Sequence, residues 1–257
     1  MFTNMLEKIL AVSQKLCDIW FARIPRKLKN SFSSKMVAHR GAHNNGNLEN
    51  TLPAFKSCLE AGVWAIELDV RWTLDGEPVV HHDEHCGRIF QRPDIVIAEV
   101  LFKNLRQQLP QIPLLAEVVK EVTPQVHLMI ELKSFLNSHQ ETKLNEILKF
   151  LKPIENFHLL SLKSEHLTSL KNFDRKCFVG VSEFNDAKYF KLCCDQQWGG
   201  YATHYLLLSS SQIDTLHQQG LRAGVGYISS KNSWIRETNR QVDWLFSNHA
   251  LRLQKMI

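Results

Sequence analysis

The sequence contains no uncharged apolar run of about 18 residues or more, which argues against a helix that crosses a membrane. A secretory signal peptide fits poorly as well. Glu7, Lys8 and Asp18 interrupt the apolar residues near the N-terminus, and no small-residue cleavage site follows them. We therefore expect a protein that neither spans a bilayer nor carries a secretory signal.

Cysteine is present without a pattern. The six cysteines are dispersed, no Cys-x-x-Cys pair occurs, and Cys193 and Cys194 are adjacent. In a chain of 257 residues this is typical of reduced thiols and not of a disulfide framework. We expect a cytoplasmic location.

The basic excess of the chain is small and gathers near the N-terminus. The formal net charge is +5, so we expect no nucleic-acid partner, yet residues 1–35 hold seven basic residues against two acidic ones. Apolar residues recur with a helical period over residues 2–22, and Pro25 stops this helix. Such a helix either packs on the main domain, for example at the bottom of a barrel, or contacts the inner face of a membrane. We predict an amphipathic basic helix and linker over residues 1–35.

From residue 36 onward, strand-like and helix-like segments alternate. Strand-like runs occur at 36–40, 65–71, 77–82, 127–133, 157–161, 177–182, 199–203, 221–227 and 242–247. Helical patterns occur at 51–61, 113–121, 139–151, 165–172, 186–196, 209–219 and 232–240. Repeated β–α units favour a parallel sheet with helices outside, and we predict one α/β domain, a TIM-type (β/α)8 barrel, over residues 36–257. The short turn before residue 77 cannot hold a helical crossover, so the barrel should be irregular there.

Polar side chains stand at the ends of several of these strands. They are His39, Glu67, Asp69, His82, Glu131 and Lys133. Alternate side chains of a strand share a face, so Glu67 and Asp69 should point the same way and repel each other unless a cation binds them. Active sites of α/β barrels lie at the C-terminal ends of the strands. We therefore predict a divalent metal site at this rim, flanked by two histidines.

Motifs in the same part of the chain resemble the glycerophosphodiester phosphodiesterase family. They are His39-Arg40-Gly41, Glu49-Asn50-Thr51, Glu67-Leu68-Asp69-Val70, Thr73-Leu74-Asp75-Gly76, Val79-Val80-His81-His82-Asp83 and Glu131-Leu132-Lys133. The resemblance is dense over residues 36–83 and resumes at 127–134. It implies a TIM-type barrel, a bound Mg²⁺ or Ca²⁺, and hydrolysis of glycerophosphodiesters to sn-glycerol 3-phosphate and an alcohol.

The resemblance implies roles for individual residues. His39 and His82 would form the acid–base pair, a task that suits histidine because its pKa lies near neutral pH. Glu67, Asp69 and Glu131 would hold the metal, and their oxygen ligands favour Mg²⁺ or Ca²⁺ over zinc.

Further residues would border the substrate. Arg40 and Lys133 would meet the phosphate, and Glu49 would position Arg40 or touch the metal. Trp72 and Tyr227 are candidates for the alcohol pocket, and either could equally belong to the core.

Two late segments depart from the family pattern and leave the alcohol open. Gly226-Tyr227-Ile228-Ser229-Ser230 stands where the family usually carries a Trp-Thr-Val-Asn-like element, and Trp244-Leu245-Phe246-Ser247-Asn248 where it carries a Gly-Ile-Ile-Thr-Asp-like strand. One alternative is a lysophospholipase D or sphingomyelinase D-like enzyme acting on membrane lipids. Another is an inactive, membrane-recruited binding module, against which the intact histidines and acids argue.

Overall fold

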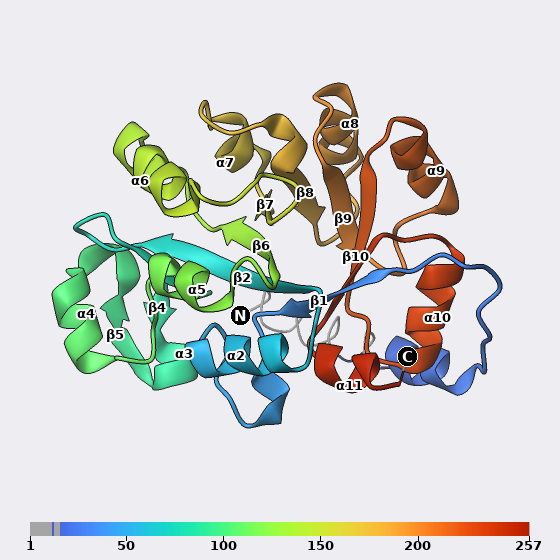
Figure 1. Ribbon diagram of the computed structural model, residues 1–257, viewed down its shortest axis with the longest axis horizontal. Coiled ribbons are helices and arrows are strands. Elements are labelled where there is room, and N and C mark those ends of the chain that lie inside the picture. The colour runs from blue at the N-terminus through green and yellow to red at the C-terminus, as the bar shows by residue number, and fades with distance from the viewer. Residues whose placement is uncertain (1–11, 13–15, 257) are drawn as a thin grey trace.

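The computed structural model describes residue 12 and residues 16–256, and a closed β-barrel forms their centre (Figure 1). Eight parallel strands within the described residues make up the barrel: β1 (Lys35–His39), β2 (Ala65–Trp72), β6 (His127–Leu132), β7 (Phe157–Ser161), β8 (Phe178–Ser182), β9 (Gly200–His204), β10 (Arg222–Gly226) and β11 (Trp244–Ser247). Strand β1 pairs with β2 on one side and β11 on the other, which closes the ring. The predicted TIM-type barrel is confirmed.

Helices surround the strands, as Figure 1 shows. They are α2 (Leu52–Glu60), α5 (Leu115–Val122), α6 (Ser138–Leu148), α7 (Ser164–Thr168), α8 (Ala187–Asp195), α9 (Ser210–Gln218), α10 (Lys231–Asn239) and α11 (Ala250–Gln254). Polar caps begin several of them: the side chains of Asn137, Asp186, Ser209 and Ser230 accept hydrogen bonds from backbone N–H groups in the first turns of α6, α8, α9 and α10.

Strand alternation decides which side chains face the barrel interior. Val37, Ala65 and Met129 pack with each other inside the barrel. Ile66 and Leu68 belong instead to the larger core between strands and helices. Glu67 and Asp69, two and four residues after Ala65, therefore also point inward, near the end of the barrel formed by the C-terminal ends of the strands.

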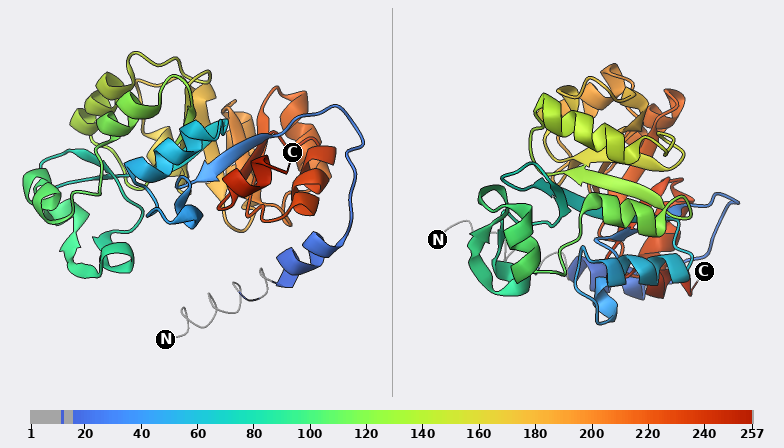
Figure 2. Two further views of the ribbon diagram at one scale, coloured as in Figure 1. Left: turned by 60° about the horizontal axis from the view of Figure 1, so that its bottom comes forward. Right: turned by 60° about the vertical axis from the view of Figure 1, so that its left-hand side comes forward.

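The irregular part of the barrel lies where the short turn predicted it. Strand β3 (Pro78–Val80) is antiparallel to β2 and returns the chain toward the rim, so the run at 77–82 is not a ninth parallel strand. The segment that follows holds elements that the sequence pattern did not predict, and Figure 2 shows them as a small unit at one side of the barrel. They are β4 (His85–Cys86), α3 (Gly87–Phe90), β5 (Arg92–Val96) and α4 (Phe102–Gln108).

Helical residues 16–23 lie at the rim of the barrel formed by the C-terminal ends of the strands. Most of the predicted helix over residues 2–22 falls outside the described residues; residues 16–23 are helical (Figure 2). The Tyr205 hydroxyl, just beyond β9, donates a hydrogen bond of 2.9 Å to Asp18, and the Tyr205 ring meets Phe21 edge to face. The bottom of the barrel is the opposite end, so this part of the helix does not plug it. Within the described residues, no helix is both long enough and apolar enough to cross a bilayer.

Candidate active site

Three carboxylates meet inside the mouth of the barrel. Asp69 is directly paired in register with Glu131, and Glu67 precedes Asp69 by two on the same inward face. One oxygen atom from each of Glu67, Asp69 and Glu131 lies within 4.8 Å of the others. Glu67 is buried, and its Oε1 atom has no hydrogen-bond partner among the described residues. Carboxylates gathered away from water in this way fit a hard divalent cation.

The pKa values in this group reflect burial and mutual repulsion. Burial raises the pKa of Glu67 well above its usual range, and the charges of Asp69 and Glu131 raise it further. Burial and Asp69 also raise the pKa of Glu131. Burial acts on Asp69 in the same direction, but the cations Lys133 and Arg40 outweigh it and hold the pKa of Asp69 below its usual range.

His39 stands at the end of β1, opposite Glu67 in the register. Its Nδ1 atom lies 2.6 Å from the side-chain oxygen of Asn248, and its Nε2 atom lies 3.8 Å from Glu67 Oε2. Because an amide oxygen only accepts, Nδ1 is the donor and the neutral ring presents an Nε2 lone pair to the pocket. Burial, and then the charge of Arg40, lowers the pKa of His39 to about 4.

His82 follows β3 and enters the same mouth from the irregular side. Its Nδ1 atom donates to Asp83 over 2.7 Å, and Arg88 in turn donates to Asp83 over 2.7 Å. Burial lowers the pKa of His82, although Asp69 and Asp83 oppose this shift. His81, by contrast, is buried away from the pocket, with Nε2 3.3 Å from the carbonyl oxygen of His85.

The cations at the mouth are bound to the carboxylates. Lys133 Nζ lies 2.6 Å from Glu131 Oε1 and 3.1 Å from Asp69 Oδ1. Arg40 Nε lies 3.3 Å from Asp69, and its Nη1 atom donates to Glu49 over 3.0 Å. Glu49 therefore contacts Arg40 and lies outside the group of three acids.

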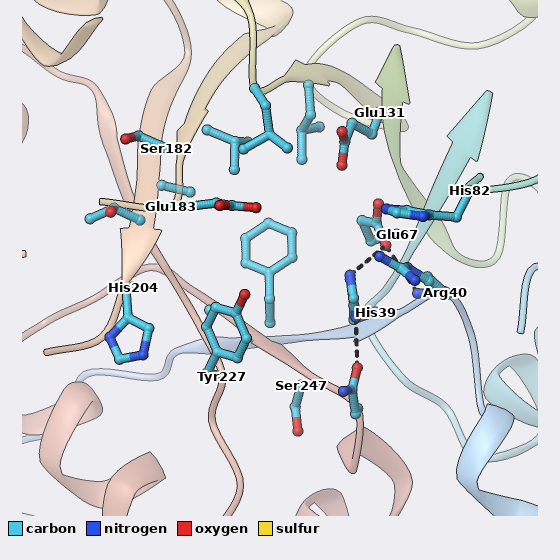
Figure 3. A pocket seen from close by; sticks show the side chains of 18 of the residues that line it. His39, Arg40, Glu67, His82, Glu131, Ser182, Glu183, His204, Tyr227 and Ser247 are labelled. Atoms are coloured by element: carbon cyan, nitrogen blue, oxygen red, sulfur yellow. Dashed lines mark hydrogen bonds and ion pairs between the residues drawn. The ribbon is translucent and has the colours of Figure 1, made fainter. Parts of the chain in front are cut away.

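Figure 3 shows that the pocket has two unlike sides. His39, Arg40, Glu67, His82 and Glu131 lie together on one side, and Ser182, Glu183, His204 and Tyr227 on the other. Apolar side chains complete the lining: Leu160, Leu162, Val181, Ala202 and Phe246. Tyr227 lines this pocket and is 54% exposed, whereas Trp72 is buried in the core.

Several residues of the site were not predicted from the sequence. Asn50 donates from its side chain to Asp69 Oδ2 over 2.7 Å. Arg88 donates to Glu49 over 2.9 and 2.7 Å as well as to Asp83, and Asn248 orients His39. Asn50, Asp83 and Asn248 stand within the quoted motifs, which could have indicated them, whereas Arg88 lies in the unpredicted segment.

Two known proteins are similar in sequence to parts of this chain. The chain is 31% identical over 156 residues to a glycerophosphodiester phosphodiesterase of Bacillus altitudinis, and the aligned region covers 55% of this chain and 62% of that protein. It is 41% identical over 63 residues to a lysophospholipase D of Homo sapiens, over 24% of this chain and 20% of that one. The chain thus spans less than two thirds of the length of these relatives.

A solved structure has the same fold. A phosphodiesterase of Oleispira antarctica, solved with the product sn-glycerol-3-phosphate, superimposes with a TM-score of 0.75 at 22% identity, covering 86% of this chain and 95% of that one. The sequence profile of the Glycerophosphoryl diester phosphodiesterase family matches residues 39–250, a range that includes every side chain on the histidine side of the pocket. The chain belongs to the glycerophosphoryl diester phosphodiesterase family.

Proposed function

We propose that this protein hydrolyses glycerophosphodiesters to sn-glycerol 3-phosphate and an alcohol. The observation that carries the proposal is the convergence of His39, His82 and three carboxylates at one barrel mouth. The Bacillus relative is named for this activity, and the Oleispira structure holds sn-glycerol-3-phosphate.

The two histidines are proposed as the acid–base pair. Displacement at phosphorus requires a proton to leave the attacking oxygen and another to reach the leaving oxygen. Asp83 stabilises an imidazolium at His82, so we assign proton removal to His82. For its part His39 must first take up a second proton on Nε2, a form that the anionic diester bound beside it favours, and as an imidazolium it donates this proton to the leaving alcohol oxygen when the P–O bond breaks. Either water or the glycerol hydroxyl could be the attacking group.

Glu67, Asp69 and Glu131 are the proposed ligands of Mg²⁺ or Ca²⁺. Their spacing within 4.8 Å and the unpartnered Oε1 of Glu67 support this assignment. Such an ion, when bound, supplies positive charge that polarises a phosphoryl oxygen. Arg40 and Lys133 lie beside these acids and are proposed to orient the anionic diester, with Glu49 positioning Arg40.

The assay is incubation with glycerophosphocholine, with and without EDTA, followed by enzymatic detection of glycerol 3-phosphate. We expect release that EDTA abolishes and added Mg²⁺ or Ca²⁺ restores. Absence of release with metal present would refute the proposed function.

Hydrolysis of lysophospholipids at a membrane surface is a second candidate function. Five consecutive strand-to-helix loops at the mouth, after β6 to β10, each expose one large apolar side chain: Phe135, Leu162, Phe184, Leu207 and Tyr227. The helical residues 16–23, which contact the same rim, expose Leu16, Ile19 and Trp20. Apolar side chains exposed on successive loops of one rim favour contact with lipid.

This candidate is tested by sedimentation with phosphatidylcholine vesicles and by turnover of lysophosphatidylcholine. We expect Phe184→Ala with Leu207→Ala to weaken both. Phe150→Ala is the matched control, because Phe150 is 86% exposed in the loop between α6 and β7, at the opposite end of the barrel. Equal behaviour of the two variants would exclude the mouth as the lipid-binding surface.

A further inference from the structure

The side of the pocket opposite the histidines contains a carboxylate that has no cationic partner among the described residues. Glu183 lies in the loop between β8 and α8, is exposed, and points into the pocket (Figure 3). Among the described residues it makes no ion pair, whereas the nearby acids Glu49, Asp69 and Glu131 on the other side all do. The catalytic role proposed above does not use it.

A negative charge at this position is unfavourable for a diester unless the substrate brings a positive charge to it. The phosphate of any glycerophosphodiester is anionic and would be repelled by a free carboxylate lining the same cavity. The cations Arg40 and Lys133 lie on the other side of the pocket, where both form ion pairs with Asp69. The feature is therefore explained if the alcohol part of the substrate carries a cation.

Tyr227 supplies an aromatic surface on the same side of the pocket. Its hydroxyl end and the Glu183 carboxylate point toward the same space (Figure 3), and burial together with the charge of Glu183 raises the pKa of Tyr227. The ring is supported from β9 by His204, with centroids 5.0 Å apart. Aromatic faces attract cations, and quaternary ammonium groups are held by combinations of aromatic rings.

The backbone at Tyr227 indicates that the position of this ring matters. Its φ angle is +68°, in the left-handed region that a bulky side chain rarely adopts. Such a conformation costs about 1–2 kcal/mol and persists where the surrounding structure requires it, often at ligand sites. Tyr227 reaches the mouth directly from the end of β10, where Gly226 also lines the pocket.

We propose that Glu183 and Tyr227 form a subsite for a positively charged alcohol group of the choline or ethanolamine type. Leu162 and Phe246, which line the same cavity, provide apolar contact for methyl and methylene groups. The inference rests on the proposed function, because it selects among glycerophosphodiesters: cationic alcohols are preferred over neutral ones such as glycerol.

The experiment compares kcat/KM for glycerophosphocholine and glycerophosphoglycerol. Glu183→Gln removes the charge and keeps the shape, and we expect it to lower kcat/KM for glycerophosphocholine ~10-fold, as loss of one charge contact, while glycerophosphoglycerol changes less than about twofold. Tyr227→Leu should likewise lower the ratio of kcat/KM for glycerophosphocholine to kcat/KM for glycerophosphoglycerol. Glu165→Gln is the matched control, since Glu165 is exposed on α7 and does not line the pocket.

A second measurement separates this inference from the proposed function. Binding of glycerophosphocholine by calorimetry in EDTA does not depend on turnover, and Glu183→Gln should weaken it by a similar factor. If the wild type hydrolyses neither substrate, the proposed function fails while the binding arm still tests the subsite. The subsite would be overturned if Glu183→Gln lowered kcat/KM equally for both diesters. It would also be overturned if the variant left both the ratio of the two kcat/KM values and the affinity for glycerophosphocholine unchanged.

Discussion

The Nδ1 atom of His39 lies 2.6 Å from the side-chain oxygen of Asn248, across the join between the first and last strands of the barrel. This hydrogen bond places the ring proton on Nδ1 and directs Nε2 to the pocket. The neutral carboxamide of Asn248 orients the His39 ring, but it stabilises an added proton on that ring less strongly than the carboxylate of Asp83 does on His82. The two histidines therefore have unlike surroundings, which suits two different roles in proton transfer.

Asn248→Ala should lower kcat about fivefold and change KM little. The hydrogen bond that is lost holds the His39 ring in its orientation and contributes about 1 kcal/mol, and no other described side chain replaces it. Asn248→Asp keeps an acceptor at the same distance and should retain more activity than the alanine variant. Steady-state kinetics on glycerophosphocholine checks both variants, and a KM effect without loss of kcat would contradict the assignment.

His39→Ala and His82→Ala should each lower kcat by ~10²–10⁴-fold, the usual contribution of a general acid or base. Both rings line a cavity and do not belong to the apolar core, so thermal unfolding should shift little. His81→Gln is a useful neighbour control, since His81 points away from the pocket. Near-normal turnover in either alanine variant would mean that the wrong acid or base had been chosen.

Strand periodicity made one side of the site predictable. Glu67, Asp69 and Glu131 could be assigned to one face because side chains alternate along a strand and parallel strands share a rim. His82 was predicted at the same rim, but the antiparallel direction of β3, which brings it there, was not predicted because it depends on a turn. Arg88 could not be predicted, because its contact with Glu49 spans 39 residues and arises from packing of a loop unit.

The N-terminal helix shows a second limit of prediction from sequence. The helical period predicts one apolar face, but it does not distinguish the residues of that face that pack on the domain from those that stay exposed to water. Phe21 contacts Tyr205, whereas Trp20 is 66% exposed. Only tertiary contacts, here with the loop after β9, divide this face into an inner and an outer part.

Mg²⁺ or Ca²⁺ should stabilise the folded protein, and Glu67→Gln should abolish this effect. At a metal concentration of about 100 times Kd, binding contributes about 2.7 kcal/mol, or about 5–10 °C in Tm. Without metal, Glu67→Gln should be as stable as the wild type or more so, because it removes a buried like charge beside Asp69. Thermal scans in EDTA and in metal check this, with Glu165→Gln as control. An equal metal-induced shift in both variants would exclude Glu67 as a ligand.

A buried histidine pair at the bottom of the barrel should make stability depend on pH. His127 Nδ1 donates to the carbonyl oxygen of Glu155 over 3.0 Å, and its Nε2 atom lies 2.8 Å from His158 Nδ1. Trp64 stacks on His127 with ring centroids 4.6 Å apart. Burial lowers the pKa of His127 to about 4, and burial with the charge of His127 lowers that of His158 to about 3. Both rings are thus neutral in the folded protein at pH values where the unfolded chain takes up protons.

The sign of this dependence follows from the depressed pKa values. The stabilisation is complete above pH ~6.5, the ordinary value for histidine, and is lost as pH falls toward 4, by at most about 1.4 kcal/mol per histidine and pH unit. The free energy of unfolding in urea should therefore fall by about 1–3 kcal/mol between pH 6.5 and 5.5. His158→Gln, which removes one titrating ring, should reduce this fall by about 1 kcal/mol. His139→Gln, on the exposed surface of α6, should leave it unchanged. If both variants keep the wild-type slope, the acid sensitivity arises elsewhere in the chain.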